Sequence, residues 1–395
     1  MRAKVNNSGA SHDAVVIGAG PSGLASAAEI MRQGADCVVL ERGDVVGNSW
    51  TRHYARLRLH TARSLSGLPG YRIPRQYGKW VARNDLVRYL EEYARHHSLN
   101  VRFGVTAERL EREDGRWKIA TSAGAFAADT VVIASGYNHT PDVPDWPGRE
   151  KFRGSLLHSS EYRDPKGYEG KRVLVVGAGN SGAEIALDLS RGGVREVWLA
   201  IRTPPNIQRR DLAGFPLQLV GIATLRLPPA TVDALSLRLQ KLGFGNLEKY
   251  GLPPPPRGVY SRAMGEERIP LIDIGTIEAI KRGEIKVVPA LERLEETEVV
   301  LAGERRLEVD AVVAATGFRR GLEGLVGHLG VLSAKGVPME RGGRTCPGAP
   351  GLHFVGYTND LGGLLRRSAI EAREVGRAVA KSRSADPRSA AIPAR

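Results

Sequence analysis

The chain has 395 residues, of which 42% are hydrophobic and 25% charged, a composition typical of a folded globular protein and not of a disordered one. This length predicts two domains. The net charge is +14, but the basic residues are dispersed and form no block. This disfavours a nucleic-acid-binding face and favours sites for small molecules that carry phosphate.

No stretch of sequence reaches the roughly 20 apolar residues of a membrane-spanning helix. The polar start, Met1 to His12, lacks the apolar core of a secretory signal. We therefore expect a cytoplasmic protein. Cys37 and Cys346 lie far apart in the sequence, which disfavours a disulfide framework, a zinc site and a redox-active dithiol. We expect two ordinary thiols and no metal site.

An internal repeat organises the chain. Residues 13–41 and 171–202 each read as strand, glycine-rich turn, helix and strand, which is a βαβ unit. Between them, the pattern predicts an amphipathic helix over 84–97, then short strands from 101 to 132 that end in a buried strand at 130–136. A matching buried strand is predicted at 309–317. We therefore expect an α/β fold with two Rossmann-like dinucleotide-binding domains.

Residues 204–267 break this pattern. The part from 212 to 242 is apolar and helix-prone around Pro228 and Pro229, and 253–256 is a stiff polyproline stretch. We interpret this segment as a helical insertion that covers the space between the two domains. The tail after Ser382 is small and polar and is expected to fray.

The first glycine motif lies between a predicted strand and a predicted helix. Its glycines permit a tight turn and let the backbone approach a pyrophosphate, whose charge is stabilised at the helix N-terminus. Glu41 ends the next strand, where it would accept hydrogen bonds from a ribose diol. The alternative is a purely structural turn. The predicted cofactor site comprises Gly18, Gly20, Ser22, Gly23, Glu41 and Arg42.

The second glycine motif differs where the ribose acid would stand, because that position holds Arg202, with Arg209 and Arg210 close behind. An arginine can pair bidentately with a 2′-phosphate, so NADP fits better than NAD. The alternative is that these arginines form a solvated face. Two dinucleotide folds imply FAD in the first and NADPH in the second, and hence an oxidoreductase. The predicted second site comprises Gly177, Gly179, Asn180, Ser181, Gly182 and the three arginines.

A third motif, from Phe152 through Gly154 and His158 to Tyr162, follows the pattern F-x-G-x-x-x-H-x-x-x-(Y/F/W). In this motif the sequence resembles the class B flavin-containing monooxygenases, and most closely the plant YUCCA-type indole-3-pyruvate monooxygenases and their bacterial relatives. Further segments look like that branch: 56–60, 245–251, 270–275, 283–289 and 315–318, the last of which contains Gly317.

The resemblance implies that NADPH reduces FAD, that O2 adds at the flavin C4a, and that the resulting (hydro)peroxide oxygenates a substrate. It also places Trp50 near the flavin. Two departures are visible: Asn48 stands where many relatives have glycine, and Gly356 is followed by Tyr357 where relatives have Asp. The segment 356–363 leads into a predicted helix whose N-terminus could face the flavin pyrimidine edge.

Two histidines are candidate catalytic residues. His60 aligns with an active-site Asn of the enzymes that oxidise nitrogen and sulfur, and the YUCCA-type branch also has His there, which favours attack on the carbonyl of a 2-oxo acid with loss of carbon dioxide. A loop-capping role for His60 is an equally open alternative. His158 reads, without the family, as a structural residue of a linker, and in the family its motif acts through the linker.

These observations predict an FAD domain of residues 1–150 and 320–395, and an NADPH domain of 151–319 inserted into it, with the site in the crevice between them. The predicted function is an FAD- and NADPH-dependent monooxygenase that acts on a small aromatic or 2-oxo acid substrate with O2. The alternatives are a heteroatom or Baeyer-Villiger ketone monooxygenase and, more distantly, a basic flavoprotein that binds nucleic acid. A disulfide reductase is disfavoured because the cysteines are unpaired. A homodimer is compatible with the sequence.

Overall fold

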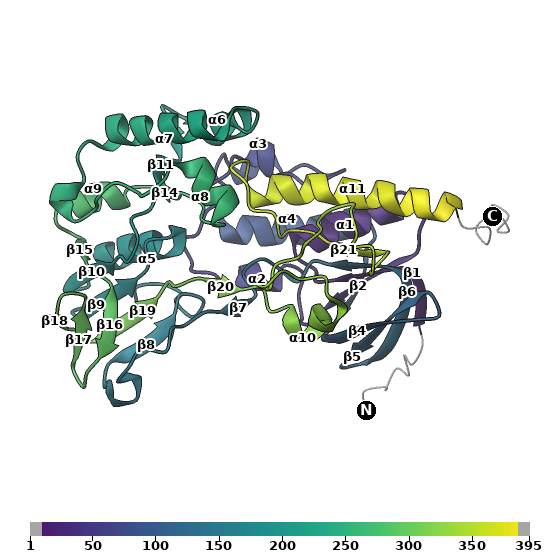
Figure 1. The fold of residues 1–395 in the computed structure, drawn as a ribbon, viewed down its shortest axis with the longest axis horizontal. Helices are drawn as coiled ribbons and strands as arrows, with labels where there is room; N and C mark the ends of the chain where they lie inside the picture. The colour runs from purple at the N-terminus through teal and green to yellow at the C-terminus, as the bar shows by residue number, and fades with distance from the viewer. Residues whose placement is uncertain (1–9, 386–395) are drawn as a thin grey trace.

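The structure is a computed structural model, and it describes residues 10–385. The predictions for the first nine residues, and for the tail beyond residue 385, lie outside the described residues. Two sheets, one mixed and one parallel, each flanked by helices, lie side by side along the long axis of the molecule (Figure 1).

The first sheet has seven strands in the order β3-β2-β1-β6-β5-β4, with β21 pairing to β6. The strands β3, β2, β1, β6 and β21 pair in parallel, and β4 and β5 extend the sheet as an antiparallel hairpin. The strands are β1 (Ala10–Ile17), β2 (Cys37–Glu41), β3 (Asn100–Phe103), β4 (Ala107–Glu113), β5 (Arg116–Thr121), β6 (Gly124–Ile133) and β21 (Leu352–Phe354).

Helices cover the first sheet because their apolar faces bury against it. Helix α1 begins at Pro21, which suits the first helical turn, and packs beside the long C-terminal helix α11 (Figure 1). The helices of this part are α1 (Pro21–Met31), α2 (Asn48–Thr51), α3 (Arg63–Ser66), α4 (Arg83–His96), α10 (Glu323–Val326) and α11 (Leu364–Ala385). The predicted helix at 84–97 and the helix after Gly363 are confirmed.

The second sheet has five parallel strands in the order β15-β10-β9-β19-β8. Helices α5 and α9 pack on one face, and a three-stranded antiparallel meander packs on the other. The elements are β8 (Ser155–His158), β9 (Arg172–Val176), α5 (Asn180–Arg191), β10 (Glu196–Ala200), α9 (Thr276–Lys281), β15 (Lys286–Val288), β16 (Leu291–Leu294), β17 (Glu298–Leu301), β18 (Arg305–Glu308) and β19 (Ala311–Ala314).

The segment between β10 and α9 contains helices, as predicted, but it does not begin as one. A short hairpin precedes the helices, because Gly214 takes a left-handed conformation and turns the chain. Helices α6 and α7 form the outermost layer over the second sheet (Figure 1). The elements are β11 (Ile207–Arg209), β12 (Asp211–Leu212), β13 (Phe215–Pro216), α6 (Gln218–Thr224), α7 (Pro229–Phe244), α8 (Val259–Gly265) and β14 (Leu271–Asp273).

Two crossings connect the two halves. The chain leaves β6 towards the second sheet through β7 (Thr140–Pro141) and returns through β20 (Phe318–Arg319), and these two short strands pair with each other. The strands of the second sheet therefore all lie between residues 155 and 314, whereas those of the first come from 10–133 and 352–354.

Candidate functional site

The first glycine turn has the geometry of a dinucleotide cradle. Gly18 has φ +105°, and a Cβ there would lie 2.5 Å from the carbonyl oxygen of Ala134. A Cβ at Gly23 would lie 1.8 Å from the carbonyl oxygen of Gly18, so this glycine lets α1 pack closely on the turn. A Cβ at Gly20 would meet no atom within 4 Å. The second glycine thus faces open space, where a pyrophosphate can approach the N-terminus of α1.

The second glycine turn repeats the first, position by position. Gly177 has φ +111°, and a Cβ there would lie 2.4 Å from the carbonyl oxygen of Ala315, whereas one at Gly182 would lie 1.9 Å from the carbonyl oxygen of Gly177. A Cβ at Gly179 would meet nothing within 4 Å. Two independent turns therefore leave the same open position before a helix, which fits two dinucleotide cofactors.

The other residues predicted for the first cofactor surround its turn. Glu41 is buried at the end of β2, and its carboxylate accepts hydrogen bonds from the backbone N–H groups of Ala19 and Gly43, each at 2.8 Å. Those bonds fix the carboxylate beside the turn and leave lone pairs for a ribose. Arg42 is exposed, and its Nη1 lies 3.1 Å from Nε2 of His139.

Three further residues of this region have defined contacts. The hydroxyl of Ser22 lies 2.8 Å from that of Ser368 on α11, which ties α1 to α11. Trp50 is half-buried and packs against the core beneath α4. Asn48 is buried with its side chain against Gly43, because a Cβ at Gly43 would lie 2.4 Å from the Asn48 Cγ. Asn48 thus fills space that glycine would leave open.

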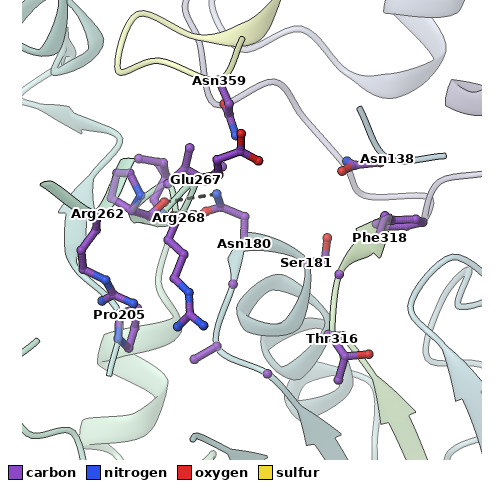
Figure 2. A pocket seen from close by; sticks show the side chains of 18 of the residues that line it. Asn138, Asn180, Ser181, Pro205, Arg262, Glu267, Arg268, Thr316, Phe318 and Asn359 are labelled. Carbon is purple, nitrogen blue, oxygen red and sulfur yellow. Dashed lines mark hydrogen bonds between the residues drawn. The ribbon is translucent and has the colours of Figure 1, made fainter. Parts of the chain in front are cut away.

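A cavity of about 830 Å³ opens beside the second glycine turn. Its walls come from both halves of the molecule: the turn at 177–181, residues 137–146 after β6, residues 315–320 after β19, and residues 359–364 before α11. Figure 2 shows Asn180 and Ser181 at the start of α5, with Arg262 and Arg268 to one side and Asn138, Thr316 and Phe318 to the other. The glycines of the first turn are not among its lining residues.

The structure brings the three predicted arginines to this cavity, but in different settings. Arg202 is exposed and makes no hydrogen bond or ion pair within the described part of the chain. Arg209 donates to the carbonyl oxygen of Gly243 at 3.0 Å and lies over the ring of Phe244. Arg210 lies over the ring of Trp80, 4.4 Å from its centroid, and beside Asp211. Arg202 is therefore the one whose guanidinium is fully available to a ligand.

Asn180 anchors the start of α5. Its amide nitrogen donates to the carbonyl oxygen of Pro270 at 3.2 Å, and its amide oxygen accepts from the backbone N–H of Ile272 at 2.7 Å (Figure 2). Both bonds are to backbone, so Asn180 joins the glycine turn to β14 and holds one wall of the cavity in place. Ser181, the next residue, lines the same wall.

The two candidate catalytic histidines lie in different surroundings. His60 lines the cavity, and its Nε2 lies 2.5 Å from Oε1 of Glu184 on α5. His158 is 2% exposed and is not among the lining residues. The His158 Nδ1 accepts from the backbone N–H of Ser160 at 3.1 Å, so its Nε2 carries the hydrogen and donates to the carbonyl oxygen of Gly317 at 3.0 Å.

His158 therefore has both ring nitrogens in use, and its burial lowers its pKa and favours the neutral ring. Its ring also contacts Phe318 edge-on at 4.8 Å. His158 does not line the cavity, and a catalytic role for it stays a prediction. We interpret His158 as a positioning residue that holds Gly317, which lines the cavity, in its left-handed conformation at φ +97°.

A cluster of side chains in the cavity wall was not predicted from the sequence. The Arg320 guanidinium lies over the Tyr137 ring, 3.3 Å from its centroid, and its Nη2 lies 2.9 Å from Oε2 of Glu267. Glu267 has φ +55°, which is uncommon for a residue with a side chain. A strained backbone at a cavity wall is typical of functional sites. No local motif indicates this cluster, because its members are up to 183 residues apart in the chain.

Comparison with known proteins shows to which family the chain belongs. Residues 15–213 match the family described as Pyridine nucleotide-disulphide oxidoreductase. The chain is 35% identical over 351 residues to the indole-3-pyruvate monooxygenase YUCCA1 of Oryza sativa subsp. japonica, covering 87% of this chain and 86% of that protein. The chain belongs to the YUCCA-type flavin monooxygenase family. The probable indole-3-pyruvate monooxygenase YUCCA3 of Arabidopsis thaliana is 32% identical over 357 residues, with 87% and 82% covered.

Solved structures agree with this membership. A flavin-containing monooxygenase from Stenotrophomonas maltophilia has a TM-score of 0.71 and 26% identity, and the match covers 94% of this chain and 99% of that one. OTEMO in complex with FAD and NADP has a TM-score of 0.72 at 18% identity, covering 94% of this chain and 84% of that one, which shows a shared fold. The predicted α/β fold class, the resemblance and the oxidoreductase class are confirmed.

The name of the matching family raises the question of disulfide chemistry. Cys37 and Cys346 are both free and both buried, and burial raises the pKa of Cys37 to about 12. Neither thiol is therefore placed to exchange electrons with a disulfide, and a flavin monooxygenase does not require that exchange. Within residues 10–385, no cluster of His, Cys, Asp and Glu could hold a metal ion, and no helix is long and apolar enough to cross a membrane.

Proposed function

We propose that this family member is an FAD- and NADPH-dependent monooxygenase that transfers oxygen from O2 to a small 2-oxo acid of the indole-3-pyruvate type. The observation that carries the proposal is the cavity itself, whose wall includes the second glycine turn and also segments that follow β6 and precede α11. It therefore lies at the carboxyl ends of strands from both sheets, where dinucleotide-binding folds hold the reactive ends of their ligands.

In this proposal, the flavin, when bound, accepts a hydride from NADPH and activates O2. The chain's own residues bind and orient the two cofactors. Gly18, Gly20 and Gly23 bring the backbone to the FAD pyrophosphate, with Glu41 on the ribose. Gly177, Gly179 and Gly182 do the same for NADPH, and Arg202 pairs with the 2′-phosphate. Ser22, Arg42, Trp50, Asn180, Ser181, Arg209, Arg210 and Gly317 complete the proposed cofactor sites.

The proposed domain arrangement follows from the same cofactors. Residues 1–150 and 320–395 would form the FAD domain, and residues 151–319 an NADPH domain inserted into it, with the helical segment at about 204–267. The order of strands supports this division, since β21 joins the first sheet after the second sheet is complete. Gln218 at the start of α6 accepts from the Ala62 N–H at 2.9 Å, so the inserted segment contacts the first half beside the cavity.

The charge on the cavity wall supports an acidic substrate. Arginines outnumber acids among the residues that line it. The arginines are Arg202, Arg209, Arg210, Arg262, Arg268 and Arg320, and the acids are Asp142, Glu267 and Asp360. The NADPH phosphates account for some of these cations. Arg262 lies in α8 and Arg268 follows the end of that helix, and Figure 2 shows them together on one side of the pocket. Arg262 is buried and is held by Glu266 and by the carbonyl oxygen of Pro204, whereas Arg268 is exposed and makes no ion pair among the described residues. Arg268 is therefore the one suited to a substrate carboxylate.

The test is product analysis under isotopically labelled dioxygen, with NADPH consumption measured in parallel. We expect indole-3-pyruvate, or a related 2-oxo acid, to stimulate NADPH oxidation and to yield carbon dioxide and a carboxylic acid that carries the label. Labelled products from thioethers or cyclic ketones, with none from 2-oxo acids, would replace the proposal with a heteroatom or ketone monooxygenase. Unlabelled products from every substrate would refute oxygen transfer.

A further inference from the structure

Two side-chain pairs join the first half of the molecule to helix α5 of the second. His60 Nε2 lies 2.5 Å from Glu184 Oε1, and Arg56 Nη1 lies 3.1 Å from Asp188 Oδ1. Glu184 and Asp188 are four residues apart and therefore share one face of α5. The segment that carries Arg56 and His60 thus lies along that face, and α5 is the helix that begins at the second glycine turn.

The two pairs differ in burial and in what lies next to them. The Glu184 side chain is 3% exposed, whereas that of Asp188 is 14% exposed. A buried carboxylate is costly unless it is paired, and His60 is the residue that pairs with it. The Tyr54 hydroxyl lies against the same carboxylate, and burial together with Glu184 raises the pKa of Tyr54 well above its ordinary value. Asp188 also accepts from the Tyr162 hydroxyl at 2.9 Å.

Only the first pair reaches the cavity, because His60 lines it and Arg56 does not. The hydrogen bond to Glu184 engages Nε2 of His60. Among residues 10–385, the His60 Nδ1 has no hydrogen-bond partner. This atom is not one of the buried polar atoms, so it is accessible from the cavity side. The imidazole is therefore held through Nε2 by α5, and Nδ1 remains accessible.

We propose that Glu184 is a positioning residue for the oxygen-transfer site: its carboxylate holds the hydrogen of His60 on Nε2 and fixes the ring, so that Nδ1 is the atom that meets substrate. A carboxylate that accepts from one ring nitrogen selects the tautomer and the orientation of the other. In the neutral ring, Nδ1 then accepts a hydrogen bond from the substrate, and in the protonated ring it donates one. The inference rests on the proposed function.

The tautomer can be read directly by NMR of the enzyme with isotope-labelled histidine ring nitrogens, with His60→Asn to assign the signal. In the wild type at neutral pH, we expect the His60 signals of a ring protonated on Nε2. In Glu184→Ala, and in Glu184→Leu if the alanine variant does not fold, the two nitrogens should move towards averaged values, because neither replacement can accept a hydrogen bond from Nε2 and so select one tautomer. Asp188→Asn is the matched control one turn along α5, and it should leave the His60 signals in place. Unchanged His60 signals in the Glu184 variants would overturn the inference.

Kinetics provide a second readout that a general loss of stability would not produce. In Glu184→Ala, we expect the product formed per NADPH consumed to fall about tenfold, whereas NADPH oxidation itself changes little. Asp188→Asn should retain the wild-type ratio. In the His60→Asn background, Glu184→Ala should cause no further loss, because its effect acts through His60. A further loss of the same size would overturn the inference. An inactive wild type would instead refute the proposed function, and the NMR result would still decide the role of Glu184.

Discussion

Two glycines of the second turn allow cofactor contact to be separated from folding. Gly179 is the N-cap of α5 with φ −78° and ψ 179°, a conformation open to alanine, and a Cβ there would meet nothing within 4 Å. Alanine is a poorer N-cap than glycine, which lowers the free energy of unfolding, but it also reduces the freedom of the unfolded chain, which raises that free energy. Gly179→Ala should therefore change the free energy of unfolding by less than about 1 kcal/mol. Gly182→Ala places a Cβ 1.9 Å from the Gly177 carbonyl oxygen and 3.1 Å from the Ala315 Cβ. The backbone must move, and this should cost about 1–3 kcal/mol.

The affinity for NADPH, unlike the stability, should be reduced in Gly179→Ala. In Gly179→Ala, the new methyl group occupies the open space where the backbone would meet the pyrophosphate. We expect the affinity for NADPH to fall at least about tenfold, which is about 1.4 kcal/mol, with an unchanged midpoint of thermal unfolding. The assay is titration of the oxidised enzyme with NADP, together with the KM for NADPH. The FAD content, measured by absorbance, is the internal control, because the first turn is unaltered.

Two outcomes would refute this reasoning. If Gly179→Ala binds NADP as the wild type does, no dinucleotide pyrophosphate approaches the N-terminus of α5. If Gly182→Ala is as stable as the wild type, the close contact between α5 and the turn does not limit stability. The equivalent pair in the first turn, Gly20 and Gly23, has the same geometry. The same two substitutions there repeat the test, with FAD content as the measured quantity.

Three further predictions concern charge and burial. Arg202→Gln should raise the KM for NADPH by about 30-fold, from the loss of about 2 kcal/mol of charge-assisted hydrogen bonding, and should leave the KM for NADH unchanged; equal effects on both would exclude a 2′-phosphate contact. Burial lowers the pKa of His158, so the unfolded chain takes up this proton first as the pH falls, and the free energy of unfolding should decrease below about pH 6.5 by up to about 1.4 kcal/mol per unit. Urea titrations of the wild type and His158→Asn at several pH values should show a shallower decrease in the variant, and identical slopes would contradict this. Because burial raises the pKa of Cys37 to about 12, iodoacetamide should alkylate this thiol only in the unfolded chain, and mass spectrometry showing its modification in the native enzyme at neutral pH would disprove it.

The parts of the fold that the sequence predicted are those specified by local patterns. In both βαβ units, an apolar strand, three spaced glycines and a helix follow one another within about 30 residues, and the structure has each of them. The amphipathic helix at 84–97 was equally accessible, because Leu86, Leu90 and Tyr93 recur at helical spacing and are buried. Periodicity and turn chemistry are sufficient where the partners are close in the chain.

The remaining features depend on contacts between distant segments. Strand β21 has only three residues, and nothing in them indicates pairing with β6 more than 200 residues earlier. Glu184 looked like an ordinary helical acid, because the residue that defines its role, His60, is 124 positions away. The sequence did identify His60, through a resemblance, but it left open whether the side chain reaches a cavity or caps a loop. Only the placement of α5 against residues 52–62 distinguishes these, and that placement is a property of the tertiary packing.

The positive charge illustrates how packing changes the meaning of composition. Many arginines that raise the net charge are paired with acids elsewhere in the chain: Arg172 contacts Asp310, and Arg293 contacts Glu304. Such pairs on the surface contribute little to stability and do not form a basic face. By contrast, Arg202 and Arg268 line the cavity between the two halves and make no ion pair among the described residues. A duplex needs a continuous exposed surface of cations, whereas a concave cavity of this size suits the anionic groups of small molecules. The unpaired arginines of the cavity therefore favour phosphate and carboxylate groups of small ligands over the nucleic-acid alternative that net charge alone allowed.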